Sequence, residues 1–284
     1  MIISASRRCD VPNYKSDWFL DSLKAGEILL PTHSFISKKI TLRKDIIDCI
    51  VFWTKNPEPM IPRIHELDGY PYYFQFTITG YGKRIEPGVP DKRHMLDVFC
   101  RLADEIAPMP VIWRYDPIAI SPSYTVEYHK SAFRQIVERL EGKSNRCVIS
   151  FIDIYGKVQN KVSQMQFRTP TIPEIEDMCS YMAEIARQHG MVVETCSERL
   201  NLLKYGIQPT HCIDANLIEQ ITGKDAIDGE GSVTASRLWL LSERGCGNLS
   251  YLWKQLHLLL CELRLTVTEE CDWKEIAKEN EKEK

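Results

Sequence analysis

Residues 49–59 read CIVFWTKNPEP. The apolar and aromatic run over 49–53 predicts a buried strand, and the polar residues Thr54, Lys55 and Asn56 follow it directly. Pro57 comes next, and proline is typical of the first position of a helix. A buried strand therefore ends in an ammonium group and an amide where a helical segment can begin.

The same order of apolar strand, polar end and amphipathic helix recurs along the chain. We predict strands over residues 1–6, 49–54, 72–79, 111–116, 147–153, 191–196 and 211–214, and helices over 16–26, 91–107, 125–143 and 171–190. Alternation of this kind is typical of a parallel α/β fold. The number of repeats favours a parallel (β/α) barrel, TIM-like, complete or partial, with an open doubly wound sheet as the alternative.

Composition excludes several classes of protein. The 284 residues are 44% hydrophobic, enough for a large core, and 36 basic residues against 39 acidic ones give a net charge of -3. This balance disfavours an extended nucleic-acid-binding surface, which usually carries a basic excess. The apolar runs are far shorter than the roughly 18 residues of a membrane span, so we expect no membrane partner and a cytoplasmic location. The sequence contains neither Gly-x-Gly-x-x-Gly after a strand nor a Walker motif.

Three segments are expected from the pattern. Residues 1–235 form the barrel domain, residues 236–272 form a C-terminal helical segment with apolar residues on one face, and residues 273–284 form a charged tail.

The ten cysteines are widely spaced and contain no Cys-x-x-Cys pair, so a disulfide framework is not expected in a cytosolic chain.

Polar side chains at the predicted strand ends form the candidate site. In parallel α/β folds the site lies at the carboxyl ends of the strands, so these residues are expected to surround one mouth. The expected substrate-binding residues are Arg7, Arg8, Asp10, Lys55, Asn56, Gln75, Arg114, Tyr155, Lys157 and Glu198, and the expected catalytic residues are Asp116, Asp153 and Glu194.

The residue types indicate the chemistry. Arg7, Arg8, Lys55 and Arg114 are suited to bind phosphate or carboxylate. The expected catalytic carboxylates provide acid/base groups or metal ligands. Thiols offer weak metal candidates, namely Cys196 beside Glu194 and Glu198, Cys212 between His211 and Asp214, and Cys246, but none has a diagnostic spacing.

Six blocks of the sequence resemble the signature of a known family. SASRRCDVP, VFWTKNPEPM, QFTITGYGKRIEP, WRYDPI, SFIDIYGKV and the pair CSE and CID occur in the family order. The chain resembles, over about residues 1–235, an uncharacterised bacterial family known as domain of unknown function 1848. Cys9 stands where the family more often has threonine.

The resemblance implies a C-terminal cysteine cluster similar to the iron–sulfur ligands of radical S-adenosylmethionine enzymes. Thiolates of this kind bind iron because they are soft ligands. This sequence departs there, because only Cys246, Cys261 and Cys271 follow residue 236. An iron–sulfur cofactor is therefore implied by the family, while its ligands are not recognisable here. Two explanations of this C-terminal difference from the family remain open, a frame shift in the coding region and true divergence of the sequence.

Three functions remain open from the sequence. The first is an α/β-barrel enzyme that acts on a small anionic or nucleotide-like substrate. The second is a nucleic-acid-associated repair or modification factor, in which Trp53, Tyr81, Trp113 and Tyr115 stack on bases. The third is a degenerate, non-catalytic member that binds a ligand with the surviving polar residues.

Overall fold

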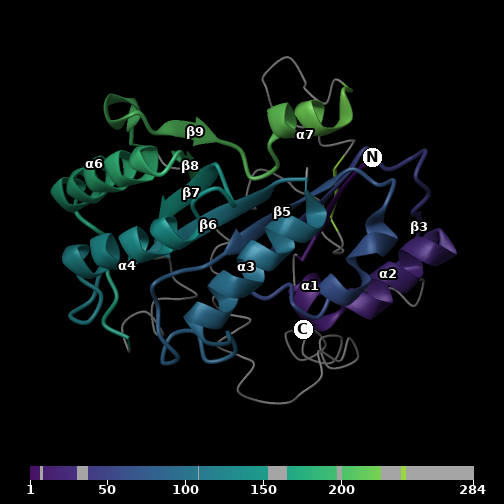
Figure 1. Ribbon diagram of the computed structural model, residues 1–284, viewed down its shortest axis with the longest axis horizontal. Coiled ribbons are helices and arrows are strands. Elements are labelled where there is room, and N and C mark those ends of the chain that lie inside the picture. Colours follow the sequence, from purple (N-terminus) through teal and green to yellow (C-terminus); the bar gives the residue numbers. More distant parts are fainter. Residues whose placement is uncertain are drawn as a thin grey trace, which may run out of the picture.

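The computed structural model describes residues 1–6, 9–30, 38–107, 109–152, 165–196, 200–224 and 238–240 (Figure 1). Its main sheet has eight strands, all paired in parallel, in the order β10-β1-β4-β5-β6-β7-β8-β9. These strands are β1 (Ile2–Ala5), β4 (Cys49–Thr54), β5 (Tyr72–Thr77), β6 (Val111–Ile118), β7 (Arg146–Phe151), β8 (Val192–Cys196), β9 (Gln208–Thr210) and β10 (Leu238–Leu240).

The strand order follows the chain from β1 to β9, and β10 returns to the free side of β1. An eight-stranded (β/α) barrel has this order, whereas a doubly wound sheet reverses its order near the middle. Pairing of β9 with β10 would close the barrel, and it is not among the pairings of the described residues. The expected parallel α/β fold is confirmed, and a closed barrel is not shown.

Helices separate most of the strands along the chain. They are α1 (Val11–Tyr14), α2 (Ser16–Ala25), α3 (Lys92–Ile106), α4 (Val126–Arg139), α6 (Ile172–Gln188) and α7 (Ala215–Thr222), with 3-10 helices at Ile61–Leu67 and Leu203–Tyr205. The four helices expected from periodicity are thus present at α2, α3, α4 and α6. A small antiparallel pair, β2 (Glu27–Leu30) with β3 (Lys38–Thr41), was not expected from the sequence.

Capping residues in the sequence fix where these helices begin and end. The Thr125 hydroxyl accepts from the backbone N–H of Tyr128 at 3.2 Å at the start of α4. Thr171 and Glu174 form a reciprocal capping box at the start of α6. Gly26 ends α2 at a φ of 74°, a left-handed conformation that glycine adopts without a steric cost.

The two faces of the sheet are covered differently. Side chains of β1, β4, β5 and β6 on one face pack with α2, α3, α4 and α6 in the larger core cluster. Figure 1 shows α3, α4 and α6 on one side of the sheet, with α7 apart from them. Apolar side chains of α7 pack instead with the opposite face, here called the inner face, whose members include Ile2, Val51, Tyr73 and Ile112.

Part of the predicted element pattern needs correction. Residues 211–214 were expected to form a strand, but β9 comes earlier, at Gln208–Thr210, and 211–214 connect it to α7. The reason is local, because the Asp214 carboxylate accepts from the Leu217 backbone N–H at 3.0 Å and caps α7.

The segment 236–272 was expected to be helical, and the structure describes only Leu238–Leu240 of it, as β10. The rest of this segment and the expected tail lie outside the described residues. Among the helices that the structure describes, none has the length and apolar character needed to cross a membrane.

Candidate active site at the strand ends

Arg114 is the centre of a buried polar network on the inner face. It lies opposite Thr77 in the register of β5 and β6, and Gln75 shares the face of Thr77 two residues earlier. The Arg114 guanidinium donates from Nε and Nη2 to Asp116, with Nη2 at 2.5 Å from Oδ2, and from Nη1 to Gln75 Oε1 at 2.6 Å. Gln75 Nε2 in turn donates to the Cys212 carbonyl at 2.6 Å.

An aromatic residue extends this network to the first strands. The Arg114 guanidinium lies over the Trp53 ring, 5.0 Å from its centroid, and Trp53 Nε1 donates to Ser4 Oγ at 3.2 Å. Contacts therefore run from β1 through β4, β6 and β5 to the segment after β9. The sequence predicted these side chains only at the ends of separate strands, and the structure shows that they contact one another as one group.

Burial keeps the Arg114–Asp116 pair away from water. The two side chains are 3% and 6% exposed. Burial acts to lower the pKa of Arg114, but Asp116, and after it the thiols of Cys196 and Cys212, raise that pKa well above its usual value. Arg114 thus stays charged, and its five N–H donors are only partly used. Nε, one Nη1 hydrogen and one Nη2 hydrogen are committed to Asp116 and Gln75 within the described residues.

A second buried ion group lies at the next strand ends. Lys55 follows β4, and its Nζ lies 2.5 Å from Glu86 Oε1, with side-chain exposures of 3% and 1%. Lys92 also pairs with Glu86, and Thr79 Oγ1 donates to Glu86 Oε2 at 2.9 Å. Burial acts to raise the pKa of Glu86, but Lys55 and then Lys92 outweigh it and lower that pKa to about 2. Two cationic side chains thus contact one buried carboxylate.

The partner of Lys55 was not predicted. Glu86 and Lys92 both follow the strand expected over 72–79, and neither was among the expected site residues. A buried ammonium needs a carboxylate, so Lys55 itself was the signal that a partner exists. Which carboxylate supplies it depends on how the loop after β5 folds back over the strand ends.

Asp10 and Asn56 connect segments of the chain at these strand ends. Asp10 Oδ2 accepts from the Lys55 backbone N–H at 2.7 Å and from Thr54 Oγ1 at 3.1 Å, and Oδ1 accepts from the Asn13 backbone N–H at 3.1 Å. Burial raises the pKa of Asp10 to about 6, against the effect of these hydrogen bonds. Asn56 Nδ2 donates to Asn13 Oδ1 at 3.1 Å. Both expected substrate-binding residues thus have a structural role.

Glu194 lies on the same sheet but has a different partner. Arg146, the first residue of β7, donates to Glu194 Oε2 at 2.6 Å and to Asp214 Oδ2 at 2.5 Å. Burial acts to lower the pKa of Arg146, and Glu194 and Asp214 outweigh it and raise that pKa. Arg146 was not predicted as a site residue, because it begins its strand and the expected site residues were those at strand ends. A catalytic role for Glu194 stays a prediction, and the structure gives it an ion-pair role.

Several expected site residues lie outside the described residues, namely Arg7, Arg8, Asp153, Tyr155, Lys157, Glu198 and Cys246. The iron–sulfur cluster implied by the family was compared with the cysteines that remain. Within the described ranges no group of three or more His, Cys, Asp or Glu side chains is arranged to hold a metal ion. Cys196 and Cys212 lie together, with their sulfurs 3.8 Å apart, but two thiols do not make a ligand set for a cluster. No chemical step is therefore derived through a cluster.

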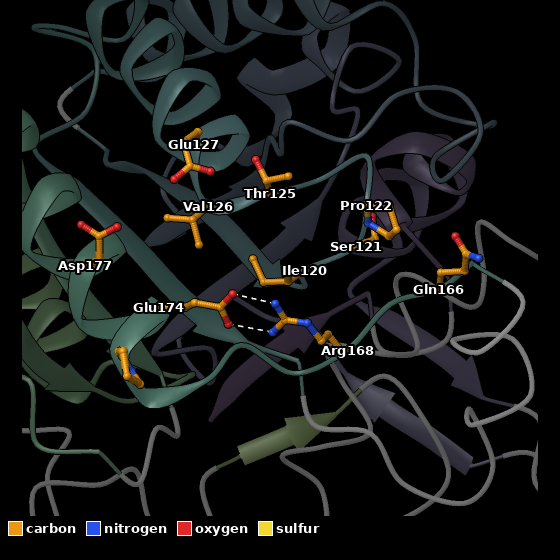
Figure 2. A pocket seen from close by; sticks show the side chains of 11 residues that line it. Ile120, Ser121, Pro122, Thr125, Val126, Glu127, Gln166, Arg168, Glu174 and Asp177 are labelled. Carbon is orange, nitrogen blue, oxygen red and sulfur yellow. Dashed lines mark hydrogen bonds and ion pairs between the residues drawn. The ribbon is translucent and has the colours of Figure 1, made fainter.

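A groove of about 810 Å³ lies elsewhere, between the segment after β6 and the starts of α4 and α6. Figure 2 shows Arg168 and Glu174 within it, joined by two hydrogen bonds of 2.7 and 2.6 Å. Arg168 is half exposed, and Glu174 already serves the capping box of α6. Because its main charged pair is exposed and serves a helix end, the groove is a weaker candidate than the buried network at Arg114.

Comparison with known proteins gives a family and weak structural likeness to solved proteins. Residues 2–243 match the family described as a domain of unknown function, DUF1848. No curated protein matches the chain. Among solved structures, a putative alpha-L-fucosidase from Bacteroides thetaiotaomicron VPI-5482 is 10% identical, with a TM-score of 0.31 over 90% of this chain and 88% of that one. A likeness at this level carries no argument about activity.

Proposed function

We propose, from the geometry of the strand ends, a function for a chain that belongs to the DUF1848 family of proteins with a domain of unknown function. The chain is an α/β-barrel enzyme that binds a small anionic or nucleotide-like substrate at the carboxyl ends of its parallel strands. In this proposal the sheet closes into a TIM-like barrel, and Arg114, Lys55 and Lys92 supply the positive charge around the substrate.

One observation supports this proposal above the others. Two buried ion groups lie along three adjacent strands: Arg114 with Asp116 within β6, and Lys55 with Glu86 in the segments that follow β4 and β5. Buried ion pairs are seldom the most stable way to fill a core, since apolar residues of similar volume often stabilise as much. Charges retained in this position are typical of a binding site, and parallel barrels carry their active sites at this end.

The cationic side chains favour an anionic ligand. Lys55 and Lys92 both lie against Glu86, and Lys92 is still 29% exposed. Arg114 retains uncommitted N–H groups within the described residues. Phosphate and carboxylate groups are the ligands that such a pair of cations binds best. Asp116, which accepts from Arg114 at 2.5 Å, is the acid/base candidate that lies beside this cation.

The nucleic-acid alternative is weakened by the position of its aromatic residues. Trp113, Tyr115 and Tyr81 are at most 1% exposed, and Trp53 is 5% exposed. Rings that stack on bases must present a face to the solvent. These four side chains instead pack inside the protein, so they are not available for bases. A non-catalytic ligand-binding protein differs from the proposed enzyme only in lacking turnover.

Calorimetric titration with a panel of phosphate monoesters and carboxylates tests the proposal. We expect at least one anion to bind, and Lys92→Met to weaken it by about tenfold, equivalent to about 1.4 kcal/mol. Lys130→Met is the matched control, because Lys130 is also a partly exposed lysine, 2.6 Å from Asp177. Absence of anion binding, or equal weakening by both variants, would contradict the proposal. Turnover of a bound anion separates the enzyme from a binding protein.

A further inference from the structure

Two cysteines, Cys196 and Cys212, lie side by side on the inner face, where β8 and β9 end. Cys196 is the last residue of β8 and is 1% exposed. It pairs in register with Thr210 of β9, and Cys212 follows two residues later and is half-buried. Both are thiols, and their sulfurs lie 3.8 Å apart. The two sulfurs are therefore close enough for a disulfide to form once the two residues move slightly closer together.

The surroundings of this pair differ from those of the other inner-face cysteine. Arg114 interacts electrostatically with both Cys196 and Cys212, and the Cys212 carbonyl accepts from Gln75. A neighbouring cation favours the thiolate, which is the reactive form of cysteine. Cys49, on the same inner face, is fully buried, and its burial raises the pKa of its thiol to about 12. Only the pair at the strand ends thus combines a cation, a partner sulfur and partial exposure among the described cysteines.

We propose that Cys196 and Cys212 form a redox-active dithiol that hydroperoxides oxidise to a disulfide. The thiolate of Cys212, the more exposed of the two, attacks hydrogen peroxide, breaks its O–O bond and becomes a sulfenic acid. The hydroxide that leaves takes up the proton lost by the Cys212 thiol and departs as water. Cys196 then attacks the sulfenic sulfur, the S–S bond forms, and a second water leaves. Overall, two thiols and one hydrogen peroxide give one disulfide and two waters. A small dithiol reverses the change by thiol–disulfide exchange.

Oxidation changes the surroundings of Arg114. The sulfurs must approach from 3.8 Å to a bond of about 2.05 Å, which moves Cys212 relative to β8. Gln75 Nε2 donates to the Cys212 carbonyl, and Gln75 Oε1 accepts from Arg114 Nη1. A movement of Cys212 is therefore transmitted to the guanidinium through these two hydrogen bonds. The dithiol is thereby a switch on the strand-end network, and its oxidation is measurable without any ligand of the proposed enzyme.

Peptide mapping of the full chain tests this inference. Protein reduced under anaerobic conditions is treated with stoichiometric hydrogen peroxide while folded, and then alkylated and digested without reductant. We expect a peptide linking Cys196 to Cys212 and the loss of two titratable thiols, both restored by dithiothreitol. Cys196→Ser should instead leave a sulfenic acid on Cys212 that dimedone traps. Cys100→Ser, a change at a mostly buried cysteine on α3, should leave the linkage intact.

Several outcomes would overturn the inference. One is the absence of the Cys196–Cys212 peptide when other cysteines of the folded protein are oxidised. Another is a linkage that joins either residue to a different cysteine. A third is iron or zinc that copurifies with the reduced chain and is lost in both Cys196→Ser and Cys212→Ser, because the two thiols would then be metal ligands. Circular dichroism of each serine variant verifies that it is folded, so that a missing linkage reports on the thiol pair.

Discussion

Replacing Glu86 by glutamine tests the buried ion group at the strand ends. The change leaves the Lys55 ammonium, 3% exposed, without its carboxylate at 2.5 Å. Removing one partner of a buried pair costs about 3–5 kcal/mol. The pKa of Glu86 gives a similar magnitude, because a decrease from 4.5 to about 2 corresponds to about 3 kcal/mol. We expect Glu86→Gln to lower the free energy of unfolding by about 3–5 kcal/mol at pH 7.

The sign of the pH dependence follows from the lowered pKa. The native state binds the Glu86 proton more weakly than the unfolded state, so this stabilisation is complete above about pH 5 and is lost as pH falls toward 2. Urea unfolding, followed by circular dichroism, should show the difference between wild type and Glu86→Gln shrinking over that range.

An exposed carboxylate is the control for this prediction. Glu58 also contacts two basic side chains, the ring of His94 at 2.7 Å and the guanidinium of Arg101 at 3.0 Å, but its side chain is 35% exposed. Glu58→Gln should therefore cost less than about 1 kcal/mol. Equal losses for the two variants would refute the reasoning, as would a Glu86→Gln difference that stays constant with pH.

Three further predictions follow from buried groups. Arg114→Met should lower the free energy of unfolding by about 3–5 kcal/mol, because it leaves the buried charge of Asp116 without its partner. Urea unfolding of the double variant Arg114→Met, Asp116→Asn should show that part of this loss is recovered. The Asp10 carboxyl should titrate near pH 6 by carbon NMR, and a midpoint at its ordinary 3.8 would contradict the effect of burial. Tyr115→Phe should lower the free energy of unfolding, measured in urea, by about 1–3 kcal/mol, because His129 Nδ1 loses its buried partner at 2.9 Å. A decrease below about 0.5 kcal/mol would contradict this expectation.

Strands buried on both faces could be predicted from the sequence. The strand expected over 49–54 coincides with β4 because its residues are all buried, which requires a continuous apolar run. β9 could not be predicted in the same way. Its residues Gln208–Thr210 are largely exposed, and β8 is its one neighbour in the sheet of the described residues, a position where its proline is tolerated. A short, exposed strand of this kind gives no apolar signal.

Individual site residues could be predicted, whereas most of their partners could not. Arg114 and Asp116 are two residues apart on one strand, so the period of a strand already places them on the same face. Lys55 and Glu86 are 31 residues apart and meet only because the loop after β5 folds back. Cys196 and Cys212 are 16 residues apart and belong to the ends of neighbouring strands. Pairings of this kind depend on tertiary structure, which local sequence patterns do not contain.

A crystal soaked in tungstate tests the central claim most directly, because the heavy oxyanion is located by its anomalous scattering. The proposed site at the strand ends predicts a peak within hydrogen-bonding distance of Arg114 or the Lys92 ammonium, displaced by excess phosphate. Peaks found only at exposed basic side chains such as Arg168, or no ordered peak at all, would contradict an anion-binding site at the strand ends.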